Sequence, residues 1–174
     1  MKISEKYLYN VSGLSTLLKI GSPALFPTDT LIALASSPSY AYKLWNLKKR
    51  PKKKPFILMG ALKDNLFGYV SSEALEDATL AAEMYWPGAL TMVLPSHDVF
   101  AQLLNPGSFT IGMRVPDCDL ARELLLHSGP LATTSANLSG HPPAITPDQA
   151  ANYFPEIPLL SPLPWATTRG LAST

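Results

Sequence analysis

ALFPTDTLIALASSPSYAYKLWNLKKRPKKKPFILM, residues 24–59, reads as a strand, a polar turn, a helix and a second strand in succession. The apolar run Ala24–Phe26 predicts a short buried strand that leads into the turn PTDT. Ser37 and Pro38 predict the start of a helix, because serine caps helix N-termini and proline is tolerated in the first turn. Phe56–Met59 predicts the next strand. This alternation of strand and helix indicates a layered α/β fold.

The same alternation continues along the rest of the chain. Apolar residues recur at helical spacing from Leu75 to Tyr85, and Pro87-Gly88 ends that pattern. Apolar residues alternate with small and polar ones over 109–115, which predicts a half-buried strand. The other predicted elements are strands over 90–94 and 131–134 and helices over 119–127 and from Thr146 onward. We therefore expect an α/β fold in which helices flank a twisted mixed sheet, with an irregular, proline-rich stretch over 142–174.

Composition and length favour one folded domain over residues 1–174. Hydrophobic residues make up 47% and charged residues 16%, which argues against a disordered chain. No apolar run approaches the roughly 18 residues of a membrane span, and the N-terminus shows no secretory signal. The single cysteine, Cys118, excludes an intramolecular disulfide. We expect a cytoplasmic protein.

The positive charge is concentrated in one place. Six of the 14 basic residues lie within 48–54, and the others are outnumbered by 13 acidic residues. Such a local concentration favours an anion site over a broad nucleic-acid surface. In an extended segment residues two apart point the same way, so Lys48 and Arg50 would face one pocket. A lysine point charge and an arginine fork suit a phosphate chain; the alternative is a solvated charge run beside a helix.

A second polar cluster follows the predicted strand over 131–134. Thr133, Ser135 and Asn137 share one side of an extended segment, and their hydroxyl and amide groups suit a ribose, a phosphate oxygen or a carboxylate. The alternative is a polar turn that satisfies its own backbone.

Arg114 closes an otherwise apolar strand and should meet an anion, because arginine is rarely buried unpaired. That anion is either a ligand or, in a structural salt bridge, Asp117. Asp29 either closes a turn or helps to bind a magnesium ion. The three histidines, His97, His127 and His141, show no ligand spacing, so no metal site is expected from histidine.

Five segments occur in a fixed order: FPTDT, LKKRPKKKP, WPGALTMVLP, TIGMRVP and ATTSANLSGHPP. Together they resemble the YrdC-like threonylcarbamoyl-AMP synthase family over roughly residues 24–146. The resemblance implies a twisted α/β sheet with a concave, positively charged groove. It also implies a nucleotidyltransferase, L-threonylcarbamoyladenylate synthase, which forms threonylcarbamoyl-AMP from L-threonine, bicarbonate and ATP and releases pyrophosphate.

The resemblance implies further partners and assigns roles to residues. ATP would be a substrate with bound Mg²⁺, and a downstream threonylcarbamoyl transferase would modify adenosine 37 of tRNA. Direct binding of tRNA or double-stranded RNA is a further expectation. The implied catalytic residues are Lys48 and Arg50. The implied ATP-binding and threonine-binding residues are Thr28, Thr30, Lys48, Arg50, Arg114, Thr133, Ser135 and Asn137.

The chain departs from the family pattern in two places. The family continues PTDT with a tyrosine and a glycine, where this chain reads Leu31-Ile32-Ala33-Leu34. The family also has a C-terminal Ser-Thr element followed by a strand, and here the chain stops at Ser173-Thr174, so a truncated C-terminal element is expected. These departures keep open a non-catalytic YrdC-like module that binds RNA through its basic loop. The carbamoyl-transfer domain of hydrogenase maturation proteins is a weaker alternative, because the zinc-finger cysteines of those proteins are missing.

Overall fold

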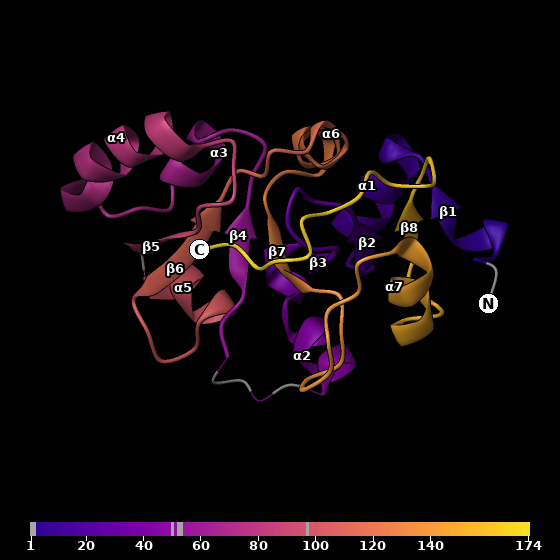
Figure 1. Ribbon diagram of the computed structural model, residues 1–174. Helices are drawn as coiled ribbons and strands as arrows, with labels where there is room; N and C mark the ends of the chain where they lie inside the picture. Colours follow the sequence, from indigo (N-terminus) through magenta and orange to yellow (C-terminus); the bar gives the residue numbers. More distant parts are fainter. Residues whose placement is uncertain (1–2, 50, 52–53, 97) are drawn as a thin grey trace.

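The computed structural model describes residues 3–49, 51, 54–96 and 98–174. Within these residues, eight strands form one twisted mixed sheet, and helices lie along its flanks (Figure 1). The strands are β1 Leu8–Tyr9, β2 Ala24–Phe26, β3 Ala33–Ser36, β4 Ile57–Met59, β5 Met92–Pro95, β6 Thr110–Arg114, β7 Leu131–Ser135 and β8 Leu159–Leu160. The predicted α/β fold is confirmed, whereas the single-domain extent over 1–174 stays a prediction.

The α-helices are α1 Val11–Lys19, α2 Tyr42–Lys48, α3 Asp64–Phe67, α4 Leu75–Tyr85, α5 Asp98–Leu104, α6 Asp119–Ser128 and α7 Pro147–Tyr153. Three short 3-10 helices are η1 Glu5–Tyr7, η2 Pro38–Tyr40 and η3 Ser72–Ala74. The capping threonine expected at Thr146 is present, since its hydroxyl accepts the N–H of Gln149 at 3.2 Å. In the described part of the chain, no helix is both long and apolar enough to pass through a membrane.

The strand order is β1-β8-β2-β3-β7-β4-β6-β5. From β2 to β4 neighbouring strands run antiparallel, whereas β4 and β6 run parallel. Leu34 pairs with Thr134, and Ile57 pairs with Thr133. The start of β3, the start of β4 and the end of β7 therefore lie side by side in the centre of the sheet.

Sequence reasoning missed several elements. β3 has four buried residues in a row, so it lacks the alternation that reveals a half-buried strand. β8 has only two residues inside the proline-rich stretch over 142–174, and it becomes a strand by pairing with β1 and β2. Much of that stretch is irregular, as expected.

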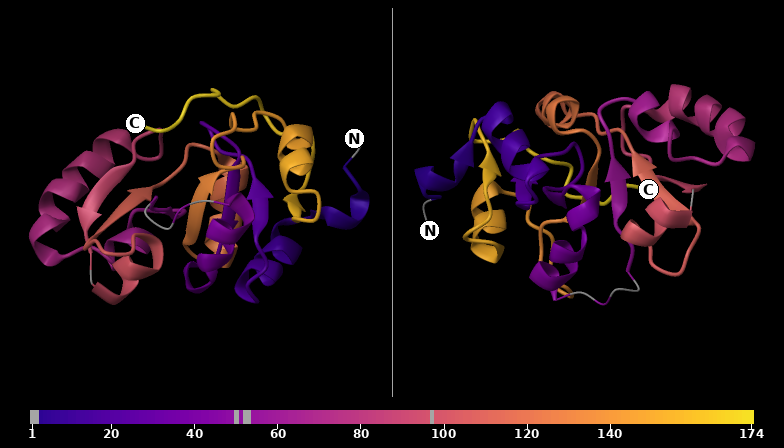
Figure 2. Two further views of the ribbon diagram at one scale, coloured as in Figure 1. Left: turned by 90° about the horizontal axis from the view of Figure 1, so that it is seen from below. Right: turned by 180° about the vertical axis from the view of Figure 1, so that it is seen from behind.

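The C-terminal segment, residues 165–174, runs across the sheet from the side of α7 toward β5 (Figure 2). The N–H of Gly170 donates to the carbonyl of Thr30 at 3.0 Å. Farther on, the N–H of Thr174 donates to the carbonyl of Ala89 at 3.1 Å, and the N–H of Thr91 donates to the carbonyl of Thr174 at 2.9 Å. The first bond holds the segment over the turn that follows β2, and the other two attach its end to the residues before β5.

Candidate functional site

A cavity of about 210 Å³ lies between the turn after β2, strands β4 and β7 and the C-terminal segment. Its lining residues are Thr28, Thr30, Leu31, Ile32, Ala33, Pro55, Ile57, Met59, Arg114, Thr133, Thr134, Ser135, Ala172 and Ser173. Five predicted site residues are among them: Thr28, Thr30, Arg114, Thr133 and Ser135. Pockets for drug-sized ligands usually measure about 300–1,000 Å³, so this cavity suits a smaller molecule.

Arg114 stands at the end of β6 and is only 2% exposed. Its Nε donates to the carbonyl of Gly88 at 2.9 Å, and its Nη1 donates to the hydroxyl of Thr30 at 2.6 Å. Its Nη2 donates to Oδ1 of Asp29 at 2.6 Å. Burial lowers the pKa of the Arg114 guanidinium, and the nearby Asp29 carboxylate opposes that change. The cavity is thus bordered by a desolvated but charge-paired arginine.

The partner of Arg114 corrects two expectations. The acid in the ion pair is Asp29, whereas Asp117 contributes its backbone N–H to Oδ1 of Asp29 at 3.1 Å. Asp29 therefore does more than close a turn, and its carboxylate is already engaged by a cation. Asp29 reaches Arg114 because the turn after β2 lies against the end of β6.

The hydroxyls of Thr28 and Thr30 form an ordered chain behind Arg114. Because Thr30 accepts from Arg114, its own proton is left for Thr28, whose hydroxyl oxygen lies 3.1 Å away. Thr28 in turn donates to the carbonyl of Leu31 at 2.6 Å. These hydrogen bonds between the two threonine hydroxyls and the Leu31 carbonyl fix the turn that forms one wall of the cavity.

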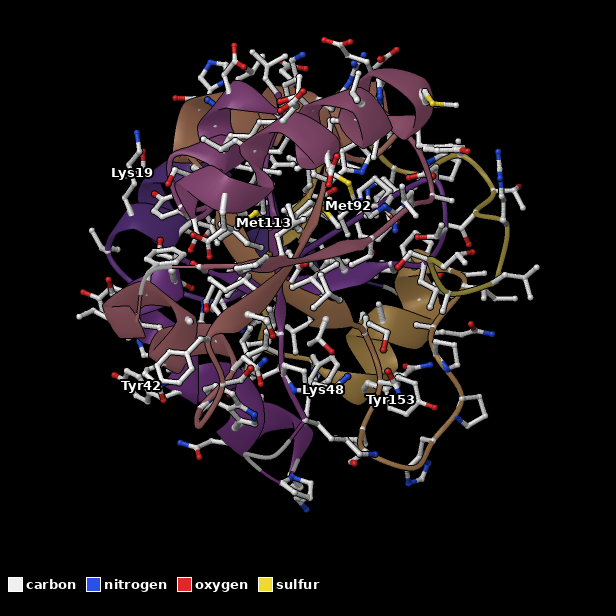
Figure 3. All side chains as sticks on the ribbon, turned by 90° about the vertical axis from the view of Figure 1, so that its left-hand side faces the viewer. Lys19, Tyr42, Lys48, Met92, Met113 and Tyr153 are labelled. Atoms are coloured by element: carbon white, nitrogen blue, oxygen red, sulfur yellow. The ribbon has the colours of Figure 1, made fainter. Side chains whose placement is uncertain are left out.

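The second cluster joins Lys48, Ser135 and Asn137. Lys48 is 2% exposed, and its Nζ donates to the carbonyl of Ser135 and to Oδ1 of Asn137, the latter at 3.1 Å. Ser135 Oγ also donates to Asn137 Oδ1, at 2.6 Å. Figure 3 shows Lys48 inside the outline of the molecule, whereas Lys19 projects outward. Lys48 is therefore not part of a solvated charge run.

The local geometry around Lys48 differs from the expected one. Lys48 is the last residue of α2, and Lys49 adopts a left-handed conformation with φ of 50°. The segment is therefore not extended at that point, and the two-residue argument for a shared direction does not hold there. Arg50, Lys52, Lys53 and His97 lie outside the described residues. The convergence of Arg50 with this cluster and the positively charged groove consequently remain predictions.

Ser135 connects the two clusters, since it lines the cavity and also bonds to Asn137. Neither Lys48 nor Asn137 lines the cavity itself. Sequence reasoning did not assign Ile57, Met59 or Ser173 to the site. Ser173 is placed by Thr91, whose hydroxyl donates to Ser173 Oγ at 2.8 Å. No local signal connects those two residues, because they are 82 positions apart.

Clustered metal ligands and a reactive thiol are two other features that could carry chemistry. The described residues contain no group of three or more His, Cys, Asp or Glu side chains arranged to hold a metal ion. Cys118 is half-buried, and burial raises the pKa of its thiol, which works against nucleophilic reactivity.

The Sua5_yciO_yrdC family model, described as telomere recombination, matches residues 16–161. The matched span contains both clusters and every cavity residue from Thr28 to Ser135. The chain belongs to the Sua5/YciO/YrdC family. Ala172 and Ser173 also line the cavity, but they lie beyond the span that the family model matches.

Threonylcarbamoyl-AMP synthases of this family are similar to most of the chain. The threonylcarbamoyl-AMP synthase of Pyrococcus abyssi is 30% identical over 141 residues, which are 79% of this chain and 41% of that protein. The threonylcarbamoyl-AMP synthase of Idiomarina loihiensis is 35% identical over 134 residues, 74% of this chain and 72% of the relative. The crystal structure of P. abyssi Sua5 complexed with L-threonine matches with a TM-score of 0.86 and 28% identity, covering 94% of this chain and 49% of Sua5. This chain thus spans less than half of the P. abyssi protein.

Proposed function

We propose that this chain is an L-threonylcarbamoyladenylate synthase, a nucleotidyltransferase that uses L-threonine, bicarbonate and ATP. One observation carries the proposal: a small cavity bordered by the buried Arg114 adjoins a hydrogen-bonded cluster of the buried Lys48 with the partly exposed Ser135 and Asn137. Membership in the Sua5/YciO/YrdC family supports it, as do the two relatives named threonylcarbamoyl-AMP synthase. The similar P. abyssi Sua5 structure is a complex with L-threonine, which supports an amino acid as one substrate.

The cavity is the proposed site of the amino acid. Arg114 would bind the carboxylate, since a guanidinium fork matches the two carboxylate oxygens. Thr28 and Thr30 would hold the wall behind Arg114, and Thr133 would contribute to the opposite wall from β7. Apolar side chains, among them Ile32, Ile57 and Met59, complete the lining.

ATP would lie next to the cavity, because about 210 Å³ is too little for a nucleotide together with an amino acid. Lys48 and Arg50 would neutralise phosphate charge, and Ser135 and Asn137 would fix the nucleotide. A carbamate oxygen forms a bond to the α-phosphorus, while the bond from that phosphorus to the pyrophosphate oxygen breaks and pyrophosphate leaves with the electron pair. The carbamate is already an anion, so the site must mainly supply positioning and charge stabilisation.

Mg²⁺ is expected from the resemblance, but the described side chains do not form a site for it. Asp29, the carboxylate beside the cavity, is engaged by Arg114. Mg²⁺ commonly binds substrate phosphates with few protein ligands. We therefore assign it no protein ligand and no step of the reaction. The proposed product would pass to a downstream threonylcarbamoyl transferase that modifies adenosine 37 of tRNA, in the cytoplasm.

The test is pyrophosphate release from ATP in the presence of bicarbonate, with and without L-threonine. A longer relative such as the P. abyssi protein, assayed in parallel, shows that the conditions permit the reaction. Release that depends on both L-threonine and bicarbonate is expected. If the relative is active and this chain releases no pyrophosphate in response to L-threonine, the proposed function is wrong.

Replacing Arg50 is expected to weaken ATP binding. Loss of a hydrogen-bond partner to a charged group often costs ~1.5–3 kcal/mol, so Arg50→Ala should raise the Kd for ATP about tenfold or more. Isothermal titration with ATP measures this, and Lys54→Ala, an exposed residue of the same loop, is the matched control. An unchanged Kd in Arg50→Ala would remove Arg50 from the site.

A further inference from the structure

Asp29 lies beside the cavity and connects three segments of the chain. Its side chain is 10% exposed, and its Oδ1 accepts from Arg114 Nη2 at 2.6 Å and from the N–H of Asp117 at 3.1 Å. Its carbonyl accepts the N–H of Arg169, in the C-terminal segment, at 3.2 Å. Asp29 does not itself line the cavity. Asp29 can therefore affect a bound molecule only through Arg114, which lines the cavity.

The Arg114 guanidinium is held at three points, by Gly88, Thr30 and Asp29. A guanidinium has five N–H groups in one plane. Three acceptors at different edges of that plane fix both its position and its rotation. One N–H on Nη1 and one on Nη2 remain without an acceptor among the described residues. Since Arg114 lines the cavity, these two N–H groups are the donors left for a ligand.

The three acceptors are not equivalent. Gly88 offers a carbonyl and Thr30 a hydroxyl, both neutral, whereas Asp29 offers a full negative charge. The charged guanidinium is the donor in all three bonds, but only the bond to Asp29 adds the Coulomb attraction between two full opposite charges. The Arg114 side chain is 3% exposed and the Asp29 side chain 10% exposed, so solvent screens their attraction only in part. Asp29 therefore contributes most to the orientation of the guanidinium.

We propose that Asp29 is a positioning residue that holds the Arg114 fork in the orientation that binds the carboxylate of the amino-acid substrate. This inference rests on the proposed function, because that function places an amino acid in the cavity. Asp29 does not touch the substrate and takes no proton from it. It determines how strongly the site prefers a carboxylate over a neutral group in the same place.

The proposal is tested with Asp29→Asn, which keeps the size of the side chain and removes its charge. Binding of L-threonine and of L-threonine amide, which lacks the carboxylate, is measured by calorimetry on the full chain. We expect the Kd for L-threonine to rise about tenfold and the preference for L-threonine over its amide to fall by a similar factor. The Kd for ATP should change by less than about twofold. A purely structural role would lower the folded fraction and leave this preference unchanged.

Asp119→Asn is the matched control, because Asp119 accepts from Arg122 at 2.7 Å in an ion pair whose carboxylate is 94% exposed. It should leave both dissociation constants unchanged. Asp29→Glu keeps the charge and moves the carboxylate by one methylene, so it should fold and show an intermediate preference. If Asp29→Asn does not fold, the preference of Asp29→Glu for L-threonine over its amide tests the positioning role instead.

The outcomes separate the two proposals. If the wild-type chain binds L-threonine and a folded Asp29 variant keeps the full preference for L-threonine over its amide, the positioning role is overturned and the proposed function stands. If the wild-type chain binds no L-threonine, the proposed function is overturned and the positioning role falls with it.

Discussion

Arg114→Met is expected to lower the free energy of unfolding by about 2–4 kcal/mol, because it leaves the largely buried Asp29 without its cation. The same change should reduce L-threonine-dependent pyrophosphate release by about 100-fold or more, since the cavity loses its cationic group. Urea denaturation measures the first effect, and the pyrophosphate assay measures the second. The two effects have separate causes, namely a largely buried acid without its cation and a missing ligand for the substrate.

The matched control is Arg122→Met. Arg122 also pairs with an aspartate, at 2.7 Å, but the Asp119 carboxylate is 94% exposed. Exposed ion pairs usually contribute only about 0–1 kcal/mol, so this variant should resemble the wild type in both assays. An Arg114→Met protein with wild-type stability would mean that the Asp29–Arg114 ion pair contributes little to folding. Wild-type activity would remove Arg114 from the site.

Lys48→Met should reduce pyrophosphate release by about 100-fold or more, and it should lower the free energy of unfolding by about 1–3 kcal/mol. The stability loss follows because the carbonyl of Ser135 loses the donor from Lys48. The activity loss follows because the ammonium is the one proposed phosphate-neutralising group in the described part of the chain, and because it holds Asn137 in place. Steady-state kinetics with ATP as the varied substrate and urea denaturation measure the two effects.

Lys63→Met is the matched control for Lys48→Met. Lys63 donates to Glu83 at 2.8 Å, and the side chains of this surface pair are 35% and 58% exposed. The control should keep both the rate and the stability of the wild type. If Lys48→Met releases pyrophosphate as fast as this control does, Lys48 has no part in the reaction.

The departures from the family pattern at Ile32 and Ala33 fall inside the cavity wall. Ile32 is 1% exposed and Ala33 is 4% exposed, and both line the cavity. Ala33 also opens β3 and pairs with Ser135, so it is part of the sheet rather than of a free loop. The chain therefore has two aliphatic side chains in the cavity wall where the family pattern has an aromatic side chain and a glycine.

Several elements could be predicted from local patterns. Ala24–Phe26, the helix over 75–85 and the strand near 131–135 lie where the sequence placed them, because each is marked by its own apolar period or by a nearby breaker. The grouping of Lys48 with Ser135 and Asn137 follows from the resemblance to the family, whose motifs occur here in the same order. The structure brings these residues into contact, while their action on ATP stays a proposal.

The sequence by itself determined the α/β class, most strand positions and the set of polar residues worth testing. Only the tertiary structure decided which of them meet. Arg114 pairs with Asp29, 85 positions away, and not with Asp117, three positions away. Lys48 is turned inward although Lys49, directly after it, leaves the helix in a left-handed conformation. The physical reason is the same in both cases: strand order and burial determine which partners a buried cation meets, and neither can be read from distance along the chain.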